Sequence, residues 1–210
     1  MILQYYNDPT ILIISAVVMV IALIFHNIAQ AFVASRLGDS GPRFSGFLAF
    51  EPQRHLDPFG VLFLFLLGFG WPHAVPVNSR NYRGRGRQEA WVWLSGIGAY
   101  LLVGFISLAI AIFFASARQT HLYLAFQVAA SYAILHAVIN LFPVLPLDMA
   151  HAALAWGNPN VRRVIQQIAG FGVLGFMVFF FILSFLGVIG GLINIFLHLF
   201  QSIILGITGL

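Results

Sequence analysis

A long apolar segment near the N-terminus constrains the fold most, because Thr10 to Ser35 contains no Asp, Glu, Lys or Arg. A segment of this length can cross the hydrocarbon layer of a bilayer as one helix. Asp8 and Pro9 predict where the helix begins, since Asp is a favoured N-cap and Pro fits the first helical position. The whole chain is also apolar, with 60% hydrophobic and 8% charged residues. We therefore expect an integral membrane protein.

Further apolar segments predict the other spans, over Ala90 to Ala115, His121 to Phe142 and Val164 to Leu186, and a last helix from about Leu192 to Ile207. Val61 to Trp71 is too short to cross as a helix and suits a re-entrant segment. Arg43 to Phe50 is a possible strand. The expected fold is an all-α polytopic membrane protein with about five transmembrane helices, a re-entrant segment and a short β-hairpin-like element. It forms one domain over residues 1–210, with a core at about 10–155 and C-terminal helices at about 164–208.

The arginines predict the orientation of these spans. The chain has no lysine, and a re-entrant Val61 to Trp71 segment places nine arginines on one side and only Arg118 on the other. The nine are Arg36, Arg43, Arg54, Arg80, Arg83, Arg85, Arg87, Arg162 and Arg163. Positive loops favour the cytoplasm, so the N-terminus is expected outside, in the plasma membrane of a prokaryote. Arginines scattered among apolar segments argue against nucleic-acid binding, which needs a solvent-facing basic surface.

The first polar motif is His26-Asn27-Ile28-Ala29-Gln30, near the end of the first span. Residues four apart share one helix face, and in a His-Glu-x-x-His pattern this lets two imidazoles bind one zinc while the Glu handles the proton of a bound water. Here Asn27 stands at the Glu position and Gln30 at the second His position. The chain has no cysteine, so only His, Asp, Glu and amide oxygens remain as metal ligands.

The second polar motif runs from Asn140 to Asp148 and contains Pro143 and Pro146. Two prolines three residues apart prevent a regular helix where the third span should end. Irregular backbone at membrane depth is tolerated only inside protein or beside a wet cavity, so Asp148 is expected to line a cavity. The same layout allows His26 and Asp148 to meet. Asp148 is also a candidate N-cap for a short helix from Met149 to Trp156.

Four stretches, in this order, resemble motifs of the site-2 protease family of intramembrane zinc metalloproteases: His26 to Asp39, Arg54 to Gly60, Gly70 to Arg83, and Asn140 to Asp148. The resemblance covers about residues 10–155. It implies a hydrolase that cleaves a membrane helix with a zinc held by two His and one Asp. Carried over by position, His26 and Asp148 match metal ligands, Gln30 matches the missing His, and Asn140 matches a residue that positions substrate.

The chain departs from the family pattern at the positions that would bind zinc and transfer protons. Gln30 offers an amide oxygen, which is a weak zinc ligand. Asn27 cannot accept and return a proton as the general base would. Met149 and Ala150 stand where the family usually has two glycines. His136 or His151 could replace the missing imidazole, and His26 and Gln30 could instead simply hydrogen-bond between helices.

The function expected from these residues is a catalytically impaired or inactive member of the family, a pseudoenzyme that binds transmembrane segments or partner proteins in the old substrate cleft, with zinc weak or absent. Two alternatives stay open. One is an active intramembrane zinc metalloendopeptidase with an unusual ligand set. The other is a small transporter or channel whose polar path is formed by His26, Gln30, Asn140 and Asp148.

Overall fold

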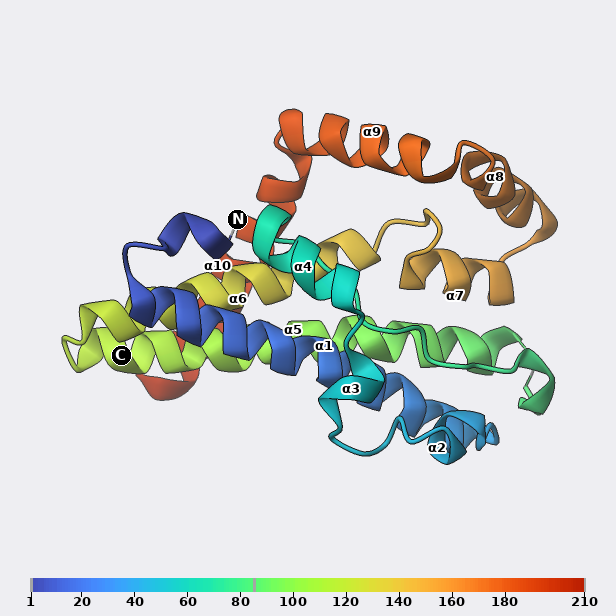
Figure 1. Cartoon of the computed structure of the whole chain (residues 1–210), viewed down its shortest axis with the longest axis horizontal. Coiled ribbons are helices and arrows are strands. Elements are labelled where there is room, and N and C mark those ends of the chain that lie inside the picture. The colour runs from blue at the N-terminus through green and yellow to red at the C-terminus, as the bar shows by residue number, and fades with distance from the viewer. Residues whose placement is uncertain (1, 85, 210) are drawn as a thin grey trace.

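The computed structural model describes residues 2–84 and 86–209, so Arg85, one of the nine arginines counted above, lies outside the described residues. Among the described residues the regular structure is helical, and strand pairing is limited to a single bridge between Leu56 and Pro72. The elements are η1 (Ile2–Tyr5), α1 (Pro9–Leu37), α2 (Gly41–Phe44), α3 (Pro52–His55), α4 (Pro58–Leu67), η2 (Ser79–Asn81), α5 (Gly86–Ser116), α6 (Thr120–Asn140), α7 (Asp148–Trp156), α8 (Pro159–Ala169), α9 (Gly172–Phe185) and α10 (Val188–Thr208) (Figure 1).

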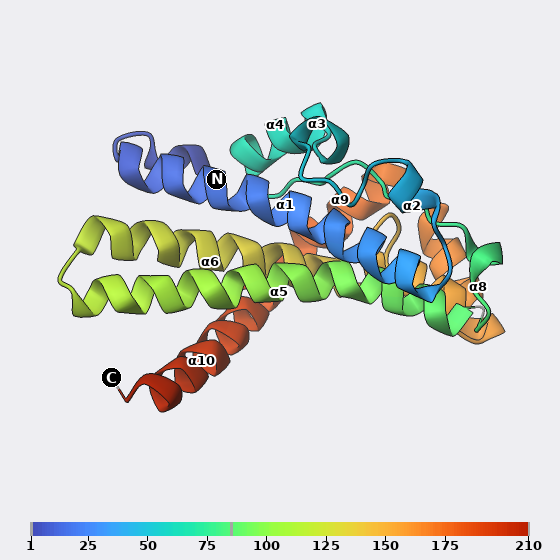
Figure 2. The ribbon, with the colours of Figure 1, turned by 90° about the horizontal axis from the view of Figure 1, so that it is seen from below.

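The core of the protein is a bundle of α1, α5 and α6, which lie side by side in both views (Figures 1 and 2). Helix α1 begins as predicted, because the Asp8 carboxylate accepts hydrogen bonds from the backbone N–H groups of Thr10 and Ile11. It ends at Gly38, whose positive φ of 115° suits a residue without a side chain. Met19 and Tyr100 are buried in the cluster that joins the three helices.

Four of the described helices are long and apolar enough to cross a membrane: α1, α5, α6 and α10. This confirms the expectation of an all-α membrane protein. Helix α4, with 10 residues, is too short to cross and covers much of the segment expected to be re-entrant. Large apolar side chains such as Phe181 and Ile195 are exposed on α9 and α10, as lipid-facing residues would be.

The span expected from Val164 to Leu186 is not one helix. The chain turns between α8 and α9 at Gly170 and Phe171, and Gly172 has a positive φ of 61°. Helix α9, with 14 residues, runs back along the bundle from α8 toward α10 (Figure 1). The predicted span was wrong because an apolar segment can be long while a glycine turn divides its backbone.

The strand expected from Arg43 to Phe50, and with it the β-hairpin-like element, is also wrong. Helix α2 occupies the start of this segment, with Pro42 at its beginning, and a turn follows at Gly46, whose φ is 82°. Phe47 is buried against Ala31 of α1 instead of alternating along a sheet. Helical turning starts here because Pro fits the first turn of a helix, and the glycine turn then ends it.

Asp39 joins the end of α1 to the loop before α5. Its buried carboxylate accepts hydrogen bonds from the backbone N–H groups of Asn78 and Gly41 at 2.7 and 3.1 Å. The side chains of Asn81 and Tyr82 also donate to it, at 2.8 and 3.3 Å. The loop from residue 78 to residue 82 is therefore fixed against the end of α1.

Candidate active site

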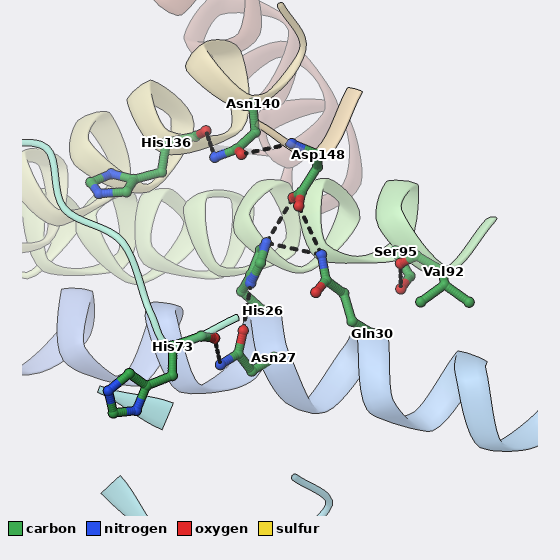
Figure 3. Close-up of polar contacts among 9 residues, drawn as sticks. All are labelled: His26, Asn27, Gln30, His73, Val92, Ser95, His136, Asn140 and Asp148. Atoms are coloured by element: carbon green, nitrogen blue, oxygen red, sulfur yellow. Dashed lines mark hydrogen bonds and ion pairs between the residues drawn. The ribbon is translucent and has the colours of Figure 1, made fainter. Parts of the chain in front are cut away.

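Helix α1 presents the first polar motif to the interior of the bundle. His26, Asn27 and Gln30 are all buried, with 6%, 1% and 1% of their surfaces exposed. Residues 26 and 30 are one helical turn apart, so His26 and Gln30 point to the same side (Figure 3). Polar side chains buried this deeply require hydrogen-bond partners from other elements.

Asp148 supplies those partners from the start of α7. The irregular segment of residues 141–147 separates α6 from α7, as the two prolines predicted, and brings the Asp148 carboxylate over α1 (Figure 3). Oδ2 of Asp148 lies 2.7 Å from His26 Nε2, and Oδ1 accepts a hydrogen bond from Gln30 Nε2 at 2.9 Å. The expectation that His26 and Asp148 meet agrees with this geometry. Asp148 is the first residue of α7, and its N-cap is Leu147, so the predicted capping role was wrong.

Asn27 fixes the position of the proton on the His26 ring. The Asn27 Nδ2 group donates to the His73 carbonyl at 2.9 Å, which leaves Asn27 Oδ1 to accept from His26 Nδ1 at 3.0 Å. With Nδ1 protonated, the contact between His26 Nε2 and Asp148 needs a second proton between nitrogen and oxygen. His26 and Asp148 are therefore a hydrogen-bonded pair, and Gln30 Nε2 donates to the other carboxylate oxygen and lies 3.3 Å from His26 Nε2.

Asn140, the last residue of α6, connects the helices on either side of the break. Its Nδ2 group donates to the His136 carbonyl at 2.9 Å, and its Oδ1 atom accepts from the backbone N–H of Asp148 at 3.3 Å. These two bonds hold Asp148 in place over α1. Asn140 therefore positions Asp148 through these two hydrogen bonds.

Two residues on α5 complete the site and could not be identified from their own sequence context. Tyr100 stacks on the His26 ring with 4.7 Å between ring centroids. A Cβ atom at Gly96 would lie 2.5 Å from His26 Nε2 and 2.6 Å from Gln30 Nε2, so only glycine permits α5 to approach this closely. A lone glycine within an apolar segment gives no such signal in the sequence.

The two histidines considered as replacement ligands are engaged elsewhere. His136 donates from Nδ1 to the Tyr132 carbonyl at 2.7 Å and accepts at Nε2 from the Gly70 N–H at 3.1 Å. His151 stacks on Trp93, with ring centroids 4.4 Å apart. Within the described part of the chain, no three His, Cys, Asp or Glu side chains are grouped closely enough to hold a metal ion.

The donor set fits a zinc ion poorly. It offers one imidazole, one carboxylate and one amide, whereas a catalytic zinc normally has three ligands of the imidazole, thiolate or carboxylate types. Two atoms that bind the same tetrahedral zinc at its usual bond lengths lie about 3.3 Å apart. His26 Nε2 and Asp148 Oδ2 are closer than this and are arranged as hydrogen-bond partners.

Two known proteins are similar in sequence to this chain. A protein of Bacillus subtilis named "Putative zinc metalloprotease YwhC" is 28% identical over 171 residues, which is 78% of each chain. A protein of Mycolicibacterium smegmatis named "Putative zinc metalloprotease Rip2" is 27% identical over 174 residues, which is 80% of this chain and 66% of the relative. The chain is therefore similar to proteins of the site-2 protease type.

The similarity to these two proteins confirms the resemblance seen in the motifs from His26 to Asp148. No family profile matches the chain, and no solved structure matches it. The two substituted positions, Asn27 and Gln30, thus lie in a site whose polar residues are hydrogen-bonded to one another.

Proposed function

We propose that this site-2-protease-like membrane protein is a catalytically impaired or inactive homologue that binds transmembrane segments or partner proteins. The observation that carries the proposal is the closed hydrogen-bond network at Asp148. Both carboxylate oxygens are occupied, one by His26 and one by Gln30, and both ends of the Asn27 amide are engaged as well. A direct contact between His26 and Asp148 lies where a metal would have to be, and the Gln30 amide stands at the position of the second imidazole.

The proton chemistry of a peptidase is missing for a separate reason. Asn27 stands where a carboxylate would take a proton from water and pass it to the leaving nitrogen, and an amide side chain cannot do so at neutral pH. A positioned general base contributes a rate factor of about 10² to 10⁴. Loss of this group alone makes cleavage slow even with a metal present.

The names of the two relatives make zinc the ion to test in this chain. His26 and Asp148 are the residues that would hold it, with the Gln30 amide as a third, weak ligand. When bound, zinc would polarise a carbonyl or activate a water. Loss or change of a ligand lowers affinity on the order of ten-fold or more, so we expect zinc to bind weakly or not at all.

The segment of residues 73–77, which is neither helix nor strand, is the candidate edge for a bound segment. It passes beside α1, where Asn27 donates to the carbonyl of His73. An unwound peptide can bind along such an edge through main-chain hydrogen bonds. A membrane segment that has unwound needs these hydrogen bonds, because lipid offers none. This edge takes the place of the strand predicted from Arg43 to Phe50.

A photocrosslinker at Ala74, which is exposed beside this edge, tests the binding role. We expect it to capture transmembrane segments of other membrane proteins in intact cells. The matched control is a crosslinker at Ile13, which is exposed on α1 and is expected to face lipid. Equal capture at both positions, or no capture at Ala74, would rule out a binding site at residues 73–77.

The catalytic part of the proposal is tested by incubating the purified protein in detergent with a peptide that contains a transmembrane helix. We expect no cleavage beyond that of a matched Asp148→Ala preparation. Cleavage by the natural protein that a chelator stops, and that Asp148→Ala lacks, would show an active metallopeptidase with an unusual ligand set.

A further inference from the structure

A second polar region lies away from the candidate active site, at the end of the bundle where α1 ends and α5 begins. A cavity of about 690 Å³ opens there between the loop before α5, helix α7 and helix α8. Figure 2 shows α8 beside the start of α5. This volume lies within the range of about 300 to 1,000 Å³ that is typical of small-ligand pockets. Its charged and polar lining residues are Ser79, Arg80, Tyr82, Arg83, Glu89, His151 and Arg162.

The charge of this cavity is positive, because three arginines face one glutamate. Among the described residues, no carboxylate lies within ion-pair distance of Arg80, Arg83 or Arg162. Guanidinium groups without a carboxylate partner attract anions, and their planar arrangement of N–H groups matches the oxygens of a phosphate.

Arg162 is held in position by the end of α7. Its Nε group donates to the Gly157 carbonyl, and one Nη group donates to the Ala155 carbonyl, both at 3.0 Å. The second Nη group keeps its N–H donors for a ligand. An arginine oriented by the protein loses less freedom when it binds an anion than a mobile one would.

Helix α8, which carries Arg162, has the character of a helix that lies on a membrane surface. Val161, Val164 and Ile168 are exposed and share one face, since they are separated by three and four residues. Arg162 and Arg163 lie away from this face. An amphipathic helix with an exposed apolar stripe and arginines on its polar side binds at the boundary between headgroups and acyl chains. The cavity next to α8 is then at the depth of the lipid phosphates.

We propose that this cavity binds the phosphate of an anionic phospholipid headgroup. The three arginines supply the phosphate donors, and the apolar face of α8 places the acyl chains beside the cavity. A net positive lining favours an anionic headgroup over a zwitterionic one, because the choline group of the latter would bring a cation to the arginines.

Native mass spectrometry of the full-length protein tests the site. The protein is released from mixed micelles that contain equal amounts of phosphatidylglycerol and phosphatidylcholine, and the retained lipid is counted. We expect preferential retention of phosphatidylglycerol. An arginine near an anionic surface contributes about a five-fold change in binding, so Arg80→Gln with Arg83→Gln should reduce this retention by about 25-fold.

The matched control removes the same amount of charge elsewhere, through Arg43→Gln with Arg118→Gln. Neither residue lines the cavity, and the control should retain phosphatidylglycerol as the natural protein does. Equal thermal unfolding of both variants shows that the fold is intact. Equal retention of the two lipids, an equal loss in the control, or displacement of the lipid by millimolar inorganic phosphate would overturn the proposal, the last by assigning the site to free phosphate.

Discussion

At the scale of single residues, the site depends on the buried pair of His26 and Asp148. The interior of the protein offers these two polar side chains few other hydrogen-bond partners. His26 and Asp148 are 2.7 Å apart, and their side chains are each 7% exposed. Removing one partner of such a pair leaves an uncompensated polar group or charge inside the protein. Gln30 adds a hydrogen bond to the same carboxylate, so the amide that weakens a zinc site strengthens the pair.

We predict that His26→Ala and Asp148→Ala each lower the free energy of unfolding by about 3 kcal/mol. The double variant should lose much less than the sum, because the two side chains stabilise the protein through one contact. Denaturant titration in detergent measures the coupling. Additive losses would show that the two residues do not act as a pair.

Gly96 gives a prediction at the same scale. Gly96→Ala should lower the free energy of unfolding by about 1–3 kcal/mol, because the new methyl group would overlap His26 and Gln30. Gly98→Ala is the control two residues along α5, where a Cβ meets open space within 4 Å. Thermal unfolding of the two variants should therefore differ. If both variants unfold at the same temperature, the close approach of α5 to the site is wrong.

At the scale of elements, the long helices could be predicted from the sequence and the breaks between them could not. The apolar segment before Arg36 and the cap at Asp8 were enough to place α1. The turn at Gly170 and Phe171 is hidden in an apolar segment, because hydropathy records composition and not the path of the backbone. The helical turn at Gly41 was missed for a similar reason, since the aromatic residues after it suggested a strand.

The loop that Asp39 holds should depend on pH. Burial by itself would raise the pKa of Asp39, but the hydrogen bonds from Asn78, Asn81, Gly41 and Tyr82 outweigh it and hold the pKa below its ordinary value. A lowered pKa in the folded state contributes stability that is present above the unfolded-state value of about 4 and is lost as the pH falls through the folded-state value.

We therefore predict that Asp39→Asn unfolds at a lower temperature than the natural protein at pH 7, and that the difference shrinks as the pH falls below about 4. Thermal unfolding over a pH series measures this. A difference that stays constant from pH 7 to pH 3 would mean that the ionised carboxylate does not hold the loop.

At the scale of the whole molecule, the two ends of the bundle differ in charge. Arg80, Arg83 and Arg162 line one cavity, so their loops lie on the same side of the protein. At the other end, the α5–α6 turn meets the start of α1, where His121 and Asp8 are 2.9 Å apart. The orientation expected from the arginines, with the basic end in the cytoplasm, stays a prediction.

Reporter fusions test this orientation. We expect fusions after Arg43, Arg83 and Arg162 to report a cytoplasmic position and a fusion near Gln119 to report an external one. The reason is the excess of arginines on one side of the predicted layout. An external signal after Arg83 would mean that the short α4 segment crosses the membrane, and the proposed orientation would then be wrong.

Part of the candidate site could also be predicted from the sequence. The helical spacing of His26 and Gln30, and the break before Asp148, were sufficient to expect these residues together. The partners of Asn27 and His136 could not be found, because they are backbone groups of His73 and Gly70 brought in by the folded chain. Sequence patterns identify side chains, whereas these contacts depend on where distant backbone segments lie.

The zinc content of the purified protein tests the central claim most directly. Elemental analysis by mass spectrometry, after purification with zinc in the medium and removal of loosely bound metal, should find well under one zinc ion per natural chain. Asn27→Glu with Gln30→His, which restores the peptidase pattern, should raise the zinc content. A stoichiometric zinc in the natural protein that disappears in His26→Ala and in Asp148→Ala would contradict the account.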